Sequence, residues 1–125
     1  MFKFRGFTKS EFIEGDLVKR EGYWIYKDNK AYSIIPESLA VTYTGLTDKS
    51  GNQIYASFEV GGKMSKGGDV VELIYVDTKM QAIVKFSNGC FELKSKGTIW
   101  GLLKRAYELN FPIEIIGKQW EQEND

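Results

Sequence analysis

Two aspartates, Asp16 and Asp69, stand in the most conspicuous local setting for chemistry, because each follows a glycine and precedes a run of apolar residues. Two carboxylates could act as general acid and general base, or could hold a divalent cation. The same pattern also fits a turn in which glycine supplies an unusual φ and the aspartate accepts hydrogen bonds from backbone amides. No third ligand is evident in the sequence, so we favour the turn and predict no catalytic or metal-binding residue.

Histidine is absent, and Cys90 is the single cysteine of the chain. The lack of histidine excludes the Ser-His-Asp and Cys-His nucleophile systems and most metal sites that use imidazole. One cysteine can form neither an intrachain disulfide nor a four-cysteine zinc site, which is typical of proteins in a reducing compartment. We therefore expect a cytoplasmic protein that is not an enzyme and binds no cofactor.

The segment 61–68 reads Gly-Gly-Lys-Met-Ser-Lys-Gly-Gly, and its glycines and lysines could in principle surround a phosphate. A phosphate-binding loop of the P-loop type ends in Gly-Lys-Ser or Gly-Lys-Thr at the start of a helix. Here Asp69 and the β-branched pair Val70-Val71 follow instead. We therefore predict a flexible loop rather than a phosphate site.

The net charge is zero, with 17 Lys and Arg against 17 Asp and Glu. Non-specific nucleic-acid binding depends on clustered cations, so a nucleic-acid partner is not favoured and would need a local basic face. Candidate contacts for such a face lie near aromatic residues on which bases could stack: Lys3, Arg5, Lys19 and Arg20. The alternative interpretation is structural, since aromatic side chains fill the core of a β domain and exposed lysines protect the edges of its sheet.

The run Tyr23-Trp24-Ile25-Tyr26 places large side chains on both faces of one expected strand. One face must cover the core, and the other must meet another part of the chain or another molecule. Tyrosine and tryptophan are frequent anchors of protein interfaces. We predict that Tyr23, Trp24 and Tyr26 form a partner-binding surface.

Short runs of β-branched and aromatic residues, separated by Gly, Asn, Asp and Lys, predict a mainly β fold. Strands are expected over 12–18, 23–27, 31–35, 39–44, 53–58, 70–76, 80–86, 90–93 and 113–116. Tight turns are expected at Asp28-Asn29-Lys30 and Asn88-Gly89, because these residue types tolerate positive φ. We expect the strand 70–76 to pair with the strand 80–86.

One short helix near the C-terminus is predicted over Thr98–Leu109, where apolar residues recur at helical spacing. Thr98 is an acceptable N-cap, and Pro112 cannot continue a helix. Gly101 opposes this prediction, because glycine lowers the stability of a helix by about 1 kcal/mol relative to alanine.

A chain of 125 residues can bury a core without disulfides or metal, so we expect a single domain over 1–125. The repeated Gly-Asp-apolar pattern leaves open a division into two β subdomains, about 1–60 and 61–117. The residues 118–125 are expected to form a frayed acidic tail. No long apolar stretch follows the N-terminus, so we expect neither a signal peptide nor a membrane span.

Four sequence segments, in this order, resemble the YopX family of phage and prophage proteins. They are Lys3-Phe4-Arg5-Gly6, Gly15-Asp16-Leu17, the central YTGLTDKSGNQIY of residues 43–55, and Ile113-Glu114-Ile115-Ile116-Gly117. The residues Ala56 to Lys66 depart from the family pattern, which usually continues directly into Glu-Gly-Asp, and they indicate a longer hairpin or loop. The resemblance implies a β-rich protein with SH3-like barrel character that works in the cytoplasm of a bacterial host. It implies no catalytic residue.

These observations favour a phage or prophage accessory protein that is a non-enzymatic binding module. Its expected partner is an unknown host or phage protein, or a second copy of the chain. The alternative is a small-barrel nucleic-acid-binding protein that uses the four basic residues named above. An enzyme that uses carboxylates such as Asp16 or Asp69 is the least favoured hypothesis.

Overall fold

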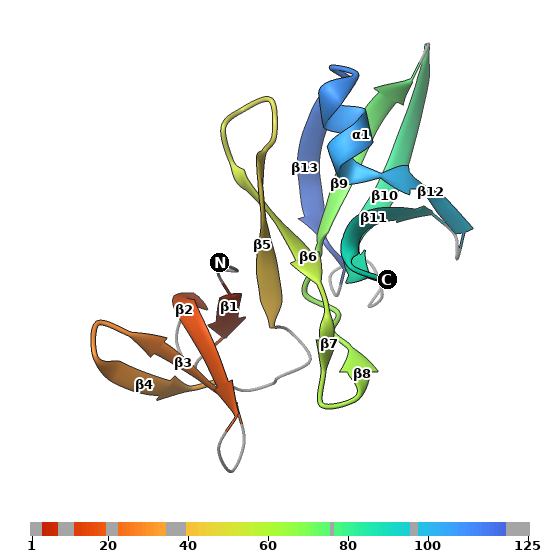
Figure 1. Ribbon diagram of the computed structural model, residues 1–125. Helices are drawn as coiled ribbons and strands as arrows, with labels where there is room; N and C mark the ends of the chain where they lie inside the picture. Colours follow the sequence, from red (N-terminus) through yellow and green to blue (C-terminus); the bar gives the residue numbers. More distant parts are fainter. Residues whose placement is uncertain are drawn as a thin grey trace.

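The computed structural model describes residues 4–7, 12–19, 23–34, 40–75, 77–95 and 98–119. These residues form mainly β-structure with one short helix, as the sequence predicted. Their strands belong to a branched 11-stranded sheet and a separate two-stranded hairpin. Figure 1 shows one group of strands at the lower end of a long central hairpin and a second group beside the hairpin.

The N-terminal lobe consists of four antiparallel strands. They are β1 (Phe4–Phe7), β2 (Phe12–Lys19), β3 (Tyr23–Lys27) and β4 (Lys30–Ser33). The β3–β4 turn is tight, because Lys27 pairs with Lys30 while Asp28 and Asn29 have φ of 51° and 64°. Two consecutive residues at positive φ match the twist of a hairpin, which confirms the predicted turn.

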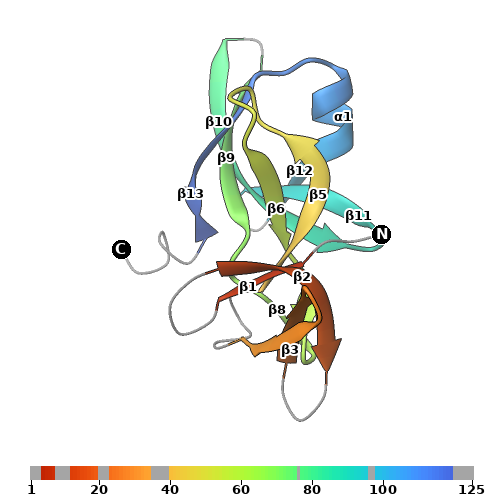
Figure 2. The same cartoon turned by 90° about the vertical axis from the view of Figure 1, so that its left-hand side faces the viewer.

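The central hairpin connects the two lobes, as Figures 1 and 2 both show. It consists of β5 (Val41–Thr47) and β6 (Gln53–Ser57). One end of β5 pairs with β1 of the N-terminal lobe. The central hairpin therefore extends the N-terminal sheet toward the second half of the chain.

The segment predicted to be a flexible loop instead forms a short hairpin. Its strands are β7 (Glu59–Val60) and β8 (Lys63–Met64), with the turn at Gly61 and Gly62. Ser65 fixes the base of the hairpin, because its amide donates to the Phe58 carbonyl at 2.8 Å and its hydroxyl accepts from the Phe58 amide at 3.0 Å. The flexible loop was the wrong prediction because the glycines supply a tight turn and Phe58 and Val60, just before it, are buried. The longer hairpin that the resemblance allowed for residues 56–66 is the alternative that the structure shows.

The C-terminal lobe contains the remaining elements, arranged around the strand β10. They are β9 (Asp69–Tyr75), β10 (Thr78–Ser87), β11 (Cys90–Ser95), β12 (Thr98–Leu102), α1 (Leu103–Glu108) and β13 (Ile113–Lys118). The strand β10 pairs with β9 near its start and with β11 near its end, and it meets β6 in parallel at Lys85 and Ser57. The predicted β9–β10 pairing and the Asn88-Gly89 hairpin are both confirmed.

The helix is shorter than predicted, since Thr98–Leu102 is the strand β12, paired antiparallel with β11. Only the second half of the helical pattern, with buried Leu103 and Ala106, is helical. The physical reason lies in the first half, where β-branched Thr98 and Ile99, aromatic Trp100 and then Gly101 all disfavour a helix.

The two Gly-Asp pairs do not form the turns that were predicted. Gly15 lies inside β2, where a Cβ would collide with the carbonyl oxygen of Tyr26 on the neighbouring strand. Asp69 begins β9, and its carboxylate accepts from the Tyr55 amide of β6 at 2.8 Å rather than from its own turn. The Gly-Asp-apolar pattern therefore serves a different structural purpose at each of its two positions.

The sheet runs from β12 at one end to β4 at the other, and the described strands do not close into a barrel. The SH3-like barrel character implied by the resemblance is therefore not confirmed.

Two hydrophobic clusters form the core. The N-terminal cluster consists of Ile13, Ile25, Ile34, Ala40, Phe58 and Val60. The C-terminal cluster consists of Ile54, Ala56, Val71, Leu73, Ala82, Val84, Leu93, Leu103, Ala106 and Ile113. Half-buried Phe86 packs against both clusters, so the lobes are in apolar contact.

Candidate functional site

The three residues predicted as a partner surface lie on two sides of β3. Tyr23 is on the same side as buried Ile25 and packs against the N-terminal cluster. Trp24 and Tyr26 are on the opposite side. Tyr26 is 45% exposed, whereas Trp24 is half-buried. The structure therefore assigns Tyr23 to the core side and leaves Trp24 and Tyr26 on the surface.

Trp24 and Tyr26 belong to a surface that extends across three strands of the N-terminal lobe. We call it the outer face, and its residues pair in two rows: Val18, Trp24 and Ser33, then Asp16, Tyr26 and Ala31. Val18 is 41% exposed. All four residues of β4 are exposed, and in the described part of the chain this strand has a neighbour on one side only. The outer face therefore ends at an accessible sheet edge.

Two of the four predicted nucleic-acid contacts, Lys3 and Arg20, lie outside the described residues. The other two are separated. Arg5 of β1 lies opposite Glu14 in the strand register of β2. Lys19 is five residues beyond Glu14 in the same strand, a separation of about 16 Å in extended backbone. Lys19 instead lies beside the ring of Tyr23, with 5.9 Å between its Nζ and the ring centre. Arg5 and Lys19 therefore do not form one basic face.

Arg5 instead lines a polar hollow between the two lobes, which we call the junction hollow. Its volume is about 580 Å³, and its lining comes from β1, β2, β3, β6, β13 and the turn of the central hairpin. The charged side chains of the lining are Arg5, Glu14, Lys27 and Lys118. Segments from both ends of the described chain thus bring three cations and one carboxylate together.

Tyr55 is the buried aromatic residue of the junction hollow, with 4% of its surface exposed. Its hydroxyl donates to the carboxylate of Glu14 and lies 2.9 Å from Oε1 of Gln53. The Arg5 guanidinium is 5.2 Å from the ring centre, and Nζ of Lys118 is 5.9 Å from it. Burial and the bond to Glu14 both raise the pKa of Tyr55, so the phenol stays protonated.

Asp69 lies beneath Tyr55 and is completely buried. Its carboxylate forms an ion pair with Lys118 and accepts the Tyr55 amide. Burial raises the pKa of Asp69, while the attraction of Lys118 and the Tyr55 amide oppose that shift. Asp69 therefore supports the junction hollow from inside, whereas Asp16 is exposed on the outer face.

Asp48 holds the turn of the central hairpin against β13. One carboxylate oxygen accepts from the amides of Ser50 and Asn52, at 3.0 and 2.9 Å, and the other accepts from the amide of Ile115 at 3.1 Å. Burial favours the protonated acid, but these amide bonds together lower the pKa of Asp48 below its ordinary value of 3.8. The aspartate of the YopX-like centre thus has a structural role.

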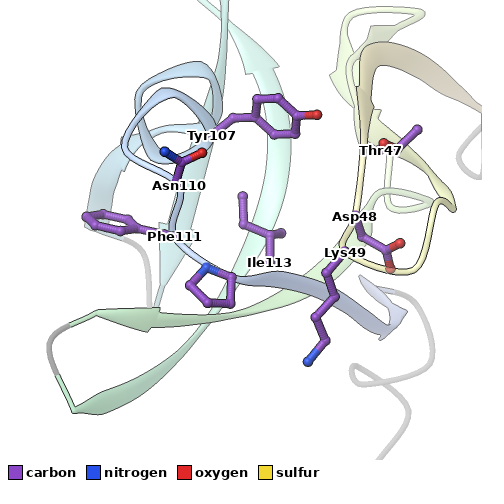
Figure 3. Close-up of a pocket in the computed structure, with 8 residues that line it drawn as sticks. Thr47, Asp48, Lys49, Tyr107, Asn110, Phe111 and Ile113 are labelled. Carbon is purple, nitrogen blue, oxygen red and sulfur yellow. The ribbon is translucent and has the colours of Figure 1, made fainter.

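A second cavity, of about 260 Å³, lies between this turn and the end of α1 (Figure 3). Thr47, Asp48 and Lys49 line one side of it, and Tyr107 and Asn110 line the other. Both oxygens of Asp48 are already hydrogen-bonded to backbone amides. Its carboxylate is therefore a poor candidate for a catalytic acid or base.

Sequence reasoning missed Lys27, Tyr55 and Lys118 as residues of a common site. The two lysines stand in no local pattern, and only the topology brings them near Arg5. Tyr55 ends the YopX-like centre, so its place in that segment was the one available signal.

Within the described residues, no helix is long and apolar enough to cross a membrane.

A comparison with models of protein families gives a match over nearly the whole chain. The model of a protein family described as YopX protein matches residues 3–124, which is nearly the whole chain. No curated protein and no solved structure matches the sequence.

Proposed function

Since the chain belongs to the YopX family, we propose that it is a non-enzymatic phage or prophage accessory protein that binds a partner protein. The partner is a host or phage protein, or a second copy of the chain, in the bacterial cytoplasm. Contact is made through the outer face and the adjoining edge strand β4. SH3-like character, in this proposal, is confined to the small sheet that carries this surface.

The observation that carries the proposal is the combination of exposed apolar side chains with an accessible edge. Val18 and Tyr26 are 41% and 45% exposed, and Trp24 lies between them in the two-row arrangement of the outer face. Aromatic anchors of this kind dominate the binding energy of many interfaces. An edge strand also offers backbone hydrogen bonds to an added strand of a partner.

The proposal predicts that Tyr26→Ser strongly weakens partner binding without unfolding the protein. The test is affinity capture of the tagged protein from lysate of phage-bearing bacteria, with and without nuclease, together with light scattering to measure self-association. Truncation of an interface anchor commonly weakens binding by about 2 kcal/mol or more, a factor of about 30. We expect the wild-type protein to retain a partner that survives nuclease, and the variant to lose it.

Tyr107→Ser is the matched control, because Tyr107 is also 45% exposed but lies on α1. We expect this variant to bind like the wild type. Equal binding by the Tyr26 and Tyr107 variants would contradict the assignment of the outer face. Loss of every captured protein after nuclease treatment would favour the nucleic-acid alternative.

A further inference from the structure

The junction hollow has a charge balance that differs from that of the whole chain. Its three cationic side chains, Arg5, Lys27 and Lys118, meet the carboxylate of Glu14 in the lining and that of Asp69 beneath it. Three positive charges against two negative ones leave an excess of one positive charge, although the net charge of the protein is zero. A concave site with this excess attracts anions.

The two carboxylates are engaged in bonds inside the protein. Glu14 accepts from the hydroxyl of Tyr55, and Asp69 accepts from the Tyr55 amide and from Lys118. Both carboxylates therefore already accept hydrogen bonds from groups of the protein, Tyr55 and Lys118. This arrangement favours an anionic ligand over a metal ion.

Lys27 differs from the other two cations of the hollow. Arg5 and Lys118 both lie over the ring of Tyr55, and Lys118 is paired with buried Asp69. Lys27 is exposed, and the described part of the chain gives it no carboxylate partner. Its charge is the one that an added anion would neutralise at the lowest desolvation cost.

The size and the neutral part of the lining indicate more than an inorganic ion. A volume of about 580 Å³ falls within the range of about 300–1,000 Å³ that is typical of small-molecule sites. Asn52 and Gln53 contribute amide side chains that can both donate and accept hydrogen bonds.

The geometry points to the junction hollow as a binding site for a phosphorylated small molecule of nucleotide size. The phosphoryl group binds between Lys27, Arg5 and Lys118, and the uncharged part of the ligand contacts Asn52 and Gln53. Lysine and arginine are the side chains that proteins use most for phosphate. This site shares no residue with the outer face, although Lys27 directly follows Tyr26 in β3.

The test is a titration of ¹⁵N-labelled full-length protein with inorganic phosphate, adenosine monophosphate and adenosine, monitored by NMR. Sodium chloride at matched ionic strength controls for screening. We expect the monophosphate to cause saturable shifts at the amides of Gly51, Asn52, Tyr55 and Lys118, with inorganic phosphate binding more weakly. Adenosine, which lacks the phosphoryl group, should cause no saturable shift.

Lys27→Gln is the decisive variant, because it removes the charge without exposing buried Asp69, as a change of Lys118 would. We expect it to weaken monophosphate binding about tenfold, the loss of one charge-assisted contact. Lys30→Gln is the matched control, because Lys30 pairs with Lys27 across the β3–β4 turn but does not line the hollow. It should leave binding unchanged.

Three outcomes would overturn the inference. The first is the absence of saturable shifts beyond those caused by sodium chloride. The second is an equal effect of the Lys27 and Lys30 variants. The third is a single-stranded oligonucleotide that binds more tightly than the monophosphate and depends on Lys27, because the hollow would then belong to a nucleic-acid site.

Discussion

Asp48 stabilises the central hairpin through three backbone amides, and this single side chain connects the hairpin turn to β13. We predict that Asp48→Asn destabilises the protein by about 2 kcal/mol at neutral pH, because an amide group replaces the oxygen that accepts from Ile115. Since the pKa of Asp48 is lowered by folding, its contribution is complete above 3.8 and disappears as the pH falls through the folded pKa. The difference between variant and wild type should therefore shrink in acid.

Urea unfolding of both proteins across a pH series measures this effect. Asp16→Asn is the control, because Asp16 is exposed and should change stability by less than about 0.5 kcal/mol. A difference between the Asp48 variant and the wild type that stays constant below pH 3.8 would show that the carboxylate charge is not what stabilises the turn.

Gly68 is required at its position because the backbone of other strands approaches it closely. A Cβ there would lie 2.5 Å from Oγ of Ser57, 2.6 Å from the Ser57 nitrogen and 2.7 Å from the Val84 carbonyl oxygen. We predict that Gly68→Ala destabilises the protein by about 3 kcal/mol or prevents folding, since the strands must separate to admit the methyl group. Thermal unfolding measures the change.

Gly117→Ala is the matched control, because no heavy atom lies within 4 Å of the position of its Cβ. We expect it to melt within a few degrees of the wild type. Similar melting temperatures for the Gly68 and Gly117 variants would refute the close approach at Gly68.

At the scale of elements, substitutions at Gly101 test whether residues 98–102 form the strand β12 or a helix, because the two structures favour different residue types. Gly101 pairs with Leu93 of β11, and a Cβ on it would have no heavy atom within 4 Å. We predict that Gly101→Val stabilises the protein by about 0.5–1 kcal/mol, and by more than Gly101→Ala does, because β-branched residues favour strands. In a helix alanine would be the more stabilising of the two. Chemical denaturation of both variants decides between these orders.

Most strands could be predicted because their cause is local. The continuous apolar run of β9 and the alternation of β10 predict one hairpin, and the residues of the Asn88-Gly89 turn predict the next one, between β10 and β11. The residues of β7 and β8 left a hairpin and a loop both open, because the burial of Phe58 and Val60 depends on distant residues of the N-terminal cluster. The sequence pattern of a segment thus predicted its secondary structure wherever contacts with distant residues did not oppose that structure.

The candidate sites could be predicted only in part for the same reason. Trp24 and Tyr26 could be predicted to share one side of a strand because residues two apart in a strand always do. The junction hollow was not recognised, because Arg5, Lys27 and Lys118 come from three strands and gain meaning only when the sheet places them around Tyr55. The alternative of a basic face rested on positions in the sequence, and residues along an extended strand separate by about 3.3 Å each.

At the scale of the whole molecule, the question is whether the two lobes unfold together. Ile54 and Ala56 of the central hairpin belong to the C-terminal cluster, whereas Phe58 and Val60, which follow them, belong to the N-terminal cluster. Phe86 packs against both clusters. The chain therefore changes lobes within a few residues, at the point where one aromatic side chain joins the two cores.

We predict that Phe86→Ala separates the unfolding of the lobes and costs about 2 kcal/mol, less than a fully buried phenylalanine because Phe86 is half-buried. The measurement is native-state hydrogen exchange, which compares amides of Ile25 in the N-terminal lobe with those of Leu73 in the C-terminal lobe. In the wild type both should exchange with the same opening free energy. In the variant Ile25 should exchange faster than Leu73, because among the described residues the N-terminal cluster has fewer large buried side chains than the C-terminal cluster. Equal acceleration at both amides would instead mean that the backbone of the central hairpin, rather than the contact at Phe86, couples the lobes.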